Sequence, residues 1–167
     1  FGRQHLTERY VSWLNDPEVV RFSEQRHRQH TLESCRAYAA SRWASDHYFL
    51  AVETIADAVH VGNIGVLVDR PNLLADMSIV IGERAVWGKG VASAAWRSVL
   101  PQLLGPLGFR KVIAGTMEVN TAMLNLMARS QMEVEAMVPR YFLWEGQEVG
   151  LVIGAAHSPE TTPARHA

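Results

Sequence analysis

The feature that most constrains this chain is a glycine-rich turn placed directly before a helix. Residues 86–96 read VWGKGVASAAW, in which a lysine stands between two glycines and small helix-forming residues follow. The first turn of a helix has backbone N–H groups without intrahelical partners, and the helix dipole adds positive charge there. Glycine allows that backbone to approach a ligand closely, so the segment predicts an anion-binding site.

This turn lies inside a mixed α/β pattern. Hydrophobic periodicity and capping residues predict helices at 7–14, after Asp16, at 31–46, from Val91 with a kink or end at Pro101, and from a cap at Asn120. Apolar runs predict strands at 48–53, 59–68, 75–81, 111–119, 134–138, 141–144 and 149–153. The order predicts an α/β fold with a mostly antiparallel sheet flanked by helices. We expect one domain over residues 1–154 and a flexible tail over 155–167.

Composition excludes several classes of protein. The 167 residues include 16 Lys and Arg against 17 Asp and Glu, so there is no basic excess for nucleic-acid binding. No apolar run is long enough to cross a bilayer, and no signal-peptide pattern is present. We therefore expect a cytoplasmic protein without nucleic-acid or membrane partners. Cys35 is the only cysteine, which excludes an intrachain disulfide and predicts a buried apolar residue.

Two common phosphate-binding motifs do not fit the turn. A Walker A loop needs four residues between its first glycine and Gly-Lys, but five separate Gly82 from Gly88, and Gly90 stands at the Ser or Thr position. A dinucleotide fingerprint would need Gly or Ala where Ser93 stands. The remaining interpretation is a pyrophosphate site at a strand-turn-helix junction.

Residues 78–95, SIVIGERAVWGKGVASAA, resemble the coenzyme A signature of the GNAT acetyltransferase superfamily. Gly90 and Ala92 match its two small positions, and Trp87 occupies its Gln or Arg position, as in the subgroup with ribosomal-protein N-terminal acetyltransferases. The resemblance implies acetyl-CoA as the cofactor and a sheet that is splayed at the cofactor site. It implies that the pyrophosphate is bound by Gly88, Lys89, Gly90, Val91, Ala92 and Ser93, with Trp87 and Asn120 also at the cofactor.

The resemblance also implies roles in catalysis. The strands at 75–81 and 111–119 are expected to diverge, so that N–H groups near Val80 and Ile81 face the acetyl carbonyl and form an oxyanion site. A carboxylate must then take the proton of the amine. Glu118 or Asp76 is favoured for this role and Glu83 is a third candidate; the alternative is that each is a solvated carboxylate.

The source of the proton for the leaving thiolate is left open. Met127 stands where relatives often have a tyrosine, so Tyr141 or water substitutes, or no dedicated acid is needed because a thiol has a pKa of about 8.5.

The acceptor side is predicted from residues 10–34, which resemble the opening of GNAT enzymes that acetylate an amine on a nucleotide-linked deoxy-sugar. Arg26, His27, Arg28 and His30 are predicted to contact a substrate phosphate, and the alternative is a solvated basic loop. A metal site at His27 and His30 lacks a third ligand, so no metal is expected.

The resemblance implies an N-acetyltransferase that acts on a primary amine of a small molecule, with an amino-sugar nucleotide as the first candidate. The alternatives are a protein N-terminal acetyltransferase, with a peptide amine as acceptor, and a non-catalytic acyl-CoA-binding module. The oligomeric state is left open between monomer and homodimer, and we expect a few residues before Phe1.

Overall fold

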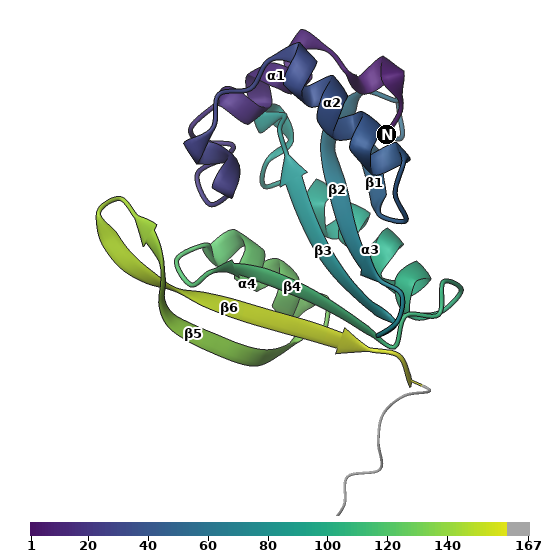
Figure 1. The fold of residues 1–167 in the computed structure, drawn as a ribbon, viewed down its shortest axis with the longest axis vertical. Helices are drawn as coiled ribbons and strands as arrows, with labels where there is room; N and C mark the ends of the chain where they lie inside the picture. Colours follow the sequence, from purple (N-terminus) through teal and green to yellow (C-terminus); the bar gives the residue numbers. More distant parts are fainter. Residues whose placement is uncertain (160–167) are drawn as a thin grey trace, which may run out of the picture. The chain divides into compact units, whose positions relative to one another are not determined.

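The computed structural model describes residues 1–159 of the chain (Figure 1). Its helices are η1 (Arg3–His5), α1 (Glu8–Asn15), η2 (Glu24–His27), α2 (Leu32–Trp43), η3 (Arg84–Val86), α3 (Val91–Leu104) and α4 (Thr121–Arg129). Its strands are β1 (Tyr48–Glu53), β2 (His60–Asp69), β3 (Leu74–Ile81), β4 (Lys111–Met117), β5 (Glu133–Trp144) and β6 (Gln147–His157).

The strands form a six-stranded sheet in the order β1-β2-β3-β4-β6-β5. Strand β3 pairs with β4 in parallel, with Asp76 opposite Ile113, whereas β1 with β2, β4 with β6 and β5 with β6 pair antiparallel. The predicted mixed α/β fold with a mostly antiparallel sheet is confirmed.

The described chain forms two compact units, and the first contains residues 1–67 and 78–95. Helix α1 begins at a cap in which Thr7 accepts from the Tyr10 N–H, and it packs beside α2, which contacts β1 (Figure 1). The core of this unit joins Tyr10 and Trp13 of α1 to Cys35 of α2. Cys35 is 2% exposed, as predicted, and burial raises the pKa of its thiol.

The second unit contains residues 68–77 and the described chain from residue 96 onward. Its core includes Phe109 and Val112, which are fully buried. Helix α4 packs on the sheet through Met127, whose terminal methyl group lies where a Cβ at Gly154 would be, so a side chain there would have to displace that methyl group. The region therefore depends on a close approach between a helix side chain and a strand backbone.

The structure differs from the sequence analysis in four places. Asp16 begins a turn and no helix, because its carboxylate accepts from the Glu18 N–H. Helix α3 continues past Pro101 to Leu104, so of the two predicted outcomes the early end at Pro101 is wrong. The two strands predicted at 134–138 and 141–144 form one strand, β5, with an irregularity between Val138 and Phe142.

The fourth difference concerns the C-terminal boundary. Strand β6 continues to His157, and Ala155 and Ala156 pair with β4, so residues 155–157 are strand and no part of a flexible tail. Their burial explains the difference, since short apolar residues fill the sheet interior there. Residues 160–167 of the predicted tail lie outside the described residues.

Candidate acetyl-transfer site

The end of β3 has a defined backbone orientation. The Gly82 N–H donates to the Val61 carbonyl at 3.0 Å, and a Cβ at Gly62 would overlap the carbonyl oxygen of Val80. Val80 and Gly82 therefore both face β2. Because polar backbone groups alternate in direction along a strand, Ile81 directs its N–H and C=O away from β2. Of the two predicted oxyanion donors, Val80 and Ile81, Ile81 is thus the one whose N–H points away from β2.

The indole of Trp87 closes the loop that follows. Its Nε1 donates to the carbonyl oxygen of Ile81 at 2.8 Å, and the Arg84 guanidinium lies 5.6 Å from the indole centroid. With this hydrogen bond in place, Trp87 is still 41% exposed. Trp87, predicted to bind the cofactor, thus uses its N–H group to hold the shape of the loop and keeps a ring surface open to a ligand.

Helix α1 anchors the same loop through two ion pairs. Arg9 lies 2.9 Å from a carboxylate oxygen of Glu83, and Arg84 lies 3.7 Å from a carboxylate oxygen of Asp16. Glu83 also accepts from the Ala85 N–H at 3.4 Å. The carboxylate of Glu83, our third candidate base, is thus engaged in holding the loop to α1.

The glycine turn before α3 has the conformation that glycine permits. Gly88 and Gly90 have φ angles of +71° and +79°, and no described heavy atom lies within 4 Å of either expected Cβ position. The Ala94 N–H donates to the Gly90 carbonyl, so the helix ladder begins there. Three first-turn N–H groups therefore have no intrahelical acceptor: those of Val91, Ala92 and Ser93. Lys89 is exposed beside them.

Asp76 is a carboxylate without a partner in the middle of β3. It is partly buried, and none of residues 1–159 donates a hydrogen bond to it or forms an ion pair with it. Burial raises the pKa of its carboxyl group above the ordinary value of 3.8. A partly desolvated carboxylate of this kind binds a proton more readily than a solvated one.

Glu118, the other favoured candidate, lies in a different environment. Its Oε1 accepts from the Gly150 N–H at 2.6 Å, and its own N–H donates to the Gly150 carbonyl at 2.9 Å. The residue is exposed, and these two bonds extend the pairing between the end of β4 and β6. One carboxylate oxygen of Glu118 is thus committed to the sheet.

Asn120 and Tyr141 lie in the second unit with the two carboxylates. Asn120 caps α4, as predicted, because its Oδ1 accepts from the Met123 N–H at 3.2 Å, and its Nδ2 donates to Thr116 Oγ1. Tyr141 is 58% exposed, with its ring 4.8 Å from the ring of Phe142. The side-chain amide of Asn120 is occupied by local structure, whereas the hydroxyl of Tyr141 lies on an open strand surface.

The four predicted acceptor contacts lie on η2 and the segment after it, in the first unit. Arg26 donates to Glu24 at 2.8 Å, and His27 lies 3.9 Å from the other oxygen of that carboxylate. Arg28 is exposed. His30 differs from the others because its Nε2 is enclosed and hydrogen-bonds none of the residues that the structure describes. The four side chains are therefore not equivalent.

Residues 1–159 contain neither a candidate metal site nor a membrane-spanning helix. Within residues 1–159, no group of three His, Cys, Asp or Glu side chains is arranged to hold a metal ion. None of the helices in that range is both long enough and apolar enough to cross a membrane.

Comparison with known families agrees with this geometry. The family model of the acetyltransferase (GNAT) domain matches residues 3–133, which is most of the chain. The chain belongs to the GNAT acetyltransferase family. Its members transfer acetyl groups and use acetyl-CoA. No protein with a curated description matches the sequence.

Solved acetyltransferase structures share the fold at low sequence identity. Spermidine N-acetyltransferase from Vibrio cholerae, in complex with CoA and spermine, is 14% identical with a TM-score of 0.84, over 95% of this chain and 92% of that one. Ribosomal-protein-alanine N-acetyltransferase from Brucella melitensis is 15% identical, with a TM-score of 0.80 over 94% and 96%. A GNAT acetyltransferase from Bacillus anthracis is 17% identical, with a TM-score of 0.80 over 95% and 92%.

The turn of this GNAT acetyltransferase fits the phosphates of acetyl-CoA. Its glycine Cβ positions open to space that a ligand can occupy, and the N–H groups at the start of α3 are hydrogen-bond donors for phosphate oxygens. The residues that would hold the pyrophosphate are Gly88, Lys89, Gly90, Val91, Ala92 and Ser93.

The acetyltransferase has no proton donor at position 127. Met127 is 2% exposed and packs against Gly154 inside the second unit. A side chain in this position fills the core, which explains why an apolar residue occupies it.

Sequence reasoning missed two glycines that shape the acetyltransferase site. A side chain at Gly62 would overlap the Val80 carbonyl, and one at Gly82 would overlap the indole of Trp13 on α1. The signal for Gly62 was present, because a glycine within the apolar run VHVGNIGVLV indicates a close backbone approach. The contact of Gly82 has no local signal, since its partner lies far away in the sequence.

Proposed function

We propose that this acetyltransferase transfers the acetyl group of acetyl-CoA to a primary amine of a small acceptor. The observation that carries the proposal is the backbone of Ile81, which points away from β2 just before the open turn of Gly88 and Gly90. An N–H donor for a carbonyl oxygen and helix N–H groups for phosphates are the two elements that recognise an acyl-CoA.

In this proposal the chain's own residues perform three tasks. The turn and the first N–H groups of α3 hold the pyrophosphate. The Ile81 N–H donates to the acetyl oxygen and stabilises the negative charge that develops there. When bound, acetyl-CoA supplies the acetyl group as a thioester whose carbonyl carbon accepts the amine and whose sulfur leaves.

Asp76 takes the proton of the acceptor in our proposal. An alkylammonium group has a pKa near ~10, so the amine must lose a proton before it attacks. The absence of any partner for Asp76 within residues 1–159, together with its partial burial, supports this role over Glu118. Val80 lies four positions after Asp76 along β3, or about 13 Å at the rise of a strand. The proton therefore travels through water.

The leaving thiolate takes its proton from solvent. Met127 is buried in the core and offers no proton, and Tyr141 is widely exposed. A thiol with a pKa near ~8.5 is a good enough leaving group to depart without a dedicated acid.

We propose an amino-sugar nucleotide as the acceptor class. The positive charge of Arg28 on an exposed segment supports a phosphate-bearing acceptor, with the exposed imidazole of His27 beside it. A peptide N-terminus is the alternative acceptor, motivated by the similarity in fold to the ribosomal-protein-alanine enzyme. A non-catalytic acyl-CoA-binding module is the third possibility, and an experiment must distinguish it from the two enzymatic ones.

An acceptor screen tests the proposal. The protein is incubated with acetyl-CoA and, in turn, glucosamine, UDP-linked amino sugars, spermidine and an alanine-terminated peptide, and both free thiol and acetylated product are measured. We expect fast thiol release matched by acetylated amino sugar. Acetylation of the peptide alone contradicts the acceptor class. Tight acetyl-CoA binding without transfer to any amine contradicts the enzymatic proposal.

A further inference from the structure

One side of α1 holds three consecutive residues of the loop that follows β3. The helix contributes three side chains that are four and three residues apart, a spacing that places them on one side of a helix. They meet the loop in pairs: Trp13 with Gly82, Arg9 with Glu83, and Asp16 with Arg84. Figure 1 shows α1 beside the end of β3. The path of the chain directly after Ile81 therefore depends on α1.

Arg9 joins this loop to the sheet through a single nitrogen atom. Its Nη2 donates to the carbonyl of His60, the first residue of β2, at 2.9 Å. The same nitrogen lies 2.9 Å from Oε2 of Glu83. The guanidinium also lies over the indole of Trp13, with its Cζ 5.2 Å from the ring centroid, and this contact restricts the directions that the guanidinium can take. Arg9 therefore bridges β2 and the loop in a defined orientation.

The backbone of the loop is bonded to the same end of β2. The N–H groups of Gly82 and Glu83 both donate to the carbonyl of Val61, at 3.0 and 3.1 Å. Because Arg9 bonds the preceding carbonyl of β2 and the side chain of Glu83, the loop is attached to β2 at two points, one through its backbone and one through a side chain. Two attachments restrict rotation of the loop more than one does. The peptide unit of Ile81 lies directly before them.

The ion pair between Arg9 and Glu83 contributes little to the stability of the fold. The two side chains are 45% and 31% exposed, and solvent screens pairs of this kind. The orientation of a hydrogen-bond donor affects a reaction rate much more, because a misplacement of about 1 Å can lower the rate ~100-fold. We therefore expect the bridge to matter more for the rate of acetyl transfer than for folding.

We infer that Arg9 is a positioning residue for acetyl transfer: through Glu83 and the carbonyl of His60, it holds the Ile81 N–H in the direction that binds the acetyl oxygen. This inference rests on the proposed function, because it takes the Ile81 N–H as the oxyanion donor. It gives the carboxylate of Glu83 the role of the partner of Arg9 in place of that of a general base.

NMR of the backbone amides tests the inference without turnover. The full chain is saturated with CoA or with S-acetonyl-CoA, a ketone analogue that presents the acetyl oxygen but cannot transfer its acyl group. In the wild type, we expect the Ile81 amide proton to move downfield with the ketone relative to CoA, because it donates to the carbonyl oxygen. Arg9→Gln should lose most of this shift, and Arg9→Lys, whose ammonium also has several donors, should keep part of it. No shift in the wild type, or a full shift in Arg9→Gln, overturns the inference.

Kinetics with the acceptor found in the screen provides the second arm. Arg9→Gln should lower kcat about tenfold, less than the ~100-fold or more lost when an oxyanion donor is removed, and leave KM for acetyl-CoA nearly unchanged. Glu83→Gln should lower kcat similarly, and the double variant should be no slower than the slower single variant, because the two residues act as one unit. Neither loss should shrink at high pH, which separates positioning from the loss of a base. Additive losses, or a rise in KM alone, overturn the inference.

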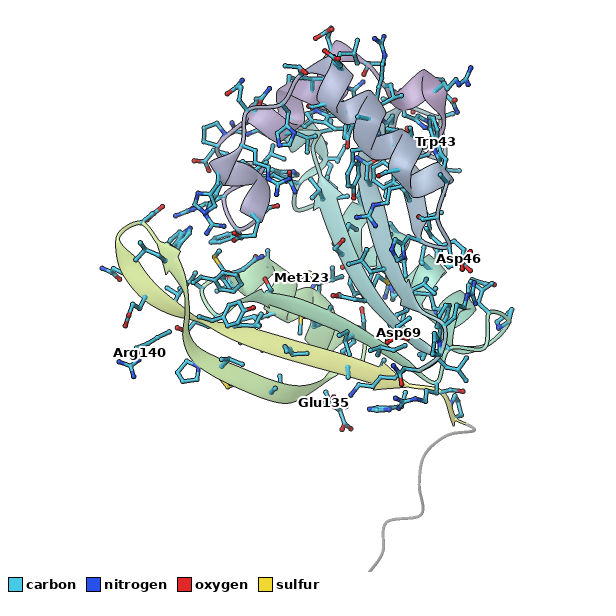
Figure 2. All side chains as sticks on the ribbon, in the orientation of Figure 1. Trp43, Asp46, Asp69, Met123, Glu135 and Arg140 are labelled. Carbon is cyan, nitrogen blue, oxygen red and sulfur yellow. The ribbon has the colours of Figure 1, made fainter. Side chains whose placement is uncertain are left out.

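A distant ion pair of the same type supplies the control. Arg140, labelled on β5 in Figure 2, is exposed and lies 3.9 Å from a carboxylate oxygen of Glu148. Arg140→Gln removes the same charge as Arg9→Gln and should keep both kcat and the Ile81 shift. An equal loss in the two variants would assign the effect to net charge and overturn the inference.

The two arms separate the inference from the proposed function. If wild-type protein acetylates none of the amines, the proposed function fails, and the NMR comparison still decides the inference by itself. If the wild type acetylates an amine and Arg9→Gln keeps its kcat, the inference fails and the proposed function stands. If Arg9→Gln does not fold, Arg9→Lys and Glu83→Gln decide both arms.

Discussion

Nε1 of Trp87 lies 2.8 Å from the carbonyl oxygen of Ile81. The bond ties the last residue of β3 to the residue before the glycine turn. It also occupies the carbonyl of Ile81 and leaves the N–H of that residue as the polar group available at the edge away from β2. Trp87 therefore links the residue proposed as the oxyanion donor to the turn proposed to bind the phosphates.

Trp87→Phe should weaken acetyl-CoA binding without unfolding the protein. The change removes one hydrogen bond but keeps an aromatic ring, which corresponds to about 0.5 to 1.5 kcal/mol, or roughly two- to tenfold in affinity. Trp43→Phe is the matched control, because the exposed Trp43 also donates its Nε1 to a backbone carbonyl, that of Phe1. Calorimetric titration with CoA checks both, and equal losses in the two variants would contradict the role of Trp87.

Gly90→Val should abolish most of the affinity for CoA. Gly90 has φ of +79°, and a β-branched residue there adds strain and fills the open space of the turn. Gly146→Val is the matched control, with φ of +77° and equally open surroundings in the hairpin between β5 and β6. Both variants should lose roughly 1 to 2 kcal/mol of stability. Only Gly90→Val should lose CoA binding, and intact affinity in a folded Gly90→Val protein would reject the site.

Gly62→Ala should lower kcat because the new Cβ meets the Val80 carbonyl and displaces the backbone that carries Ile81. Overpacking of this kind costs roughly 1 to 3 kcal/mol of stability. Gly65→Ala on the same strand is the control, since its Cβ would meet only Ser78 Oγ at 3.0 Å, which can rotate. Single-turnover rates and thermal melts compare the two. A Gly62→Ala enzyme with a native rate would show that the Ile81 backbone is not critical.

Asp76→Asn should lower the rate at pH 7 by about 100- to 10,000-fold and leave KM for acetyl-CoA nearly unchanged. Part of the rate should return at high pH, where the amine loses its proton unaided. Glu118→Gln should lose less than about tenfold, because Glu118 is exposed and bonded to Gly150. Rate profiles from pH 5 to 10 check this, and the reverse ranking of the two variants would assign the base to Glu118.

The carboxylate of Asp76 should lower the stability of the folded protein at neutral pH, whereas a paired carboxylate usually raises it. Burial raises the folded pKa of Asp76 above 3.8, so its contribution to stability is full below pH 3.8 and is lost as pH rises through the folded pKa. Asp76→Asn should therefore raise the Tm at pH 7, and the gain should vanish as the pH approaches 3.8. Thermal melts across this range check the sign. A lower Tm at pH 7 would indicate that the carboxylate has a partner in solution.

Glu135 should show the opposite dependence. Its hydrogen bond with Lys111, and then its bond with His157, lower the pKa of its carboxyl group below 4.5. Its contribution to stability is present above pH 4.5 and is lost as pH falls through the lowered pKa. Glu135→Gln should lower the Tm at pH 7 by a small amount, because the group is partly exposed. Thermal melts of wild-type and Glu135→Gln proteins should differ at pH 7 and converge as the pH falls through the lowered pKa, and a constant difference at all pH values would contradict this account.

Local patterns in the sequence determined the parts of this protein that depend on neighbours within about four residues. The caps at Thr7, Thr31 and Asn120 and the glycine turn before α3 follow from side chains and dihedral preferences close in the chain. The fold class and the phosphate site were predicted for that reason. The helix predicted after Asp16 does not form, because the Asp16 carboxylate accepts from the Glu18 N–H and completes a turn.

Only the tertiary structure decided which candidate residues are free to act. One carboxylate oxygen of Glu118 accepts from the N–H of Gly150, which lies 32 residues further along the chain. Asp76 has no hydrogen-bond or ion-pair partner within residues 1–159. Met127 became a core residue because Gly154 lies against it. Asn15 bonds to the backbone of His30, whereas the enclosed Nε2 of the His30 ring has no partner within residues 1–159. Whether each polar group has a hydrogen-bond partner depends on contacts between segments that are distant in the sequence. The spacing of residues along the chain does not predict these contacts.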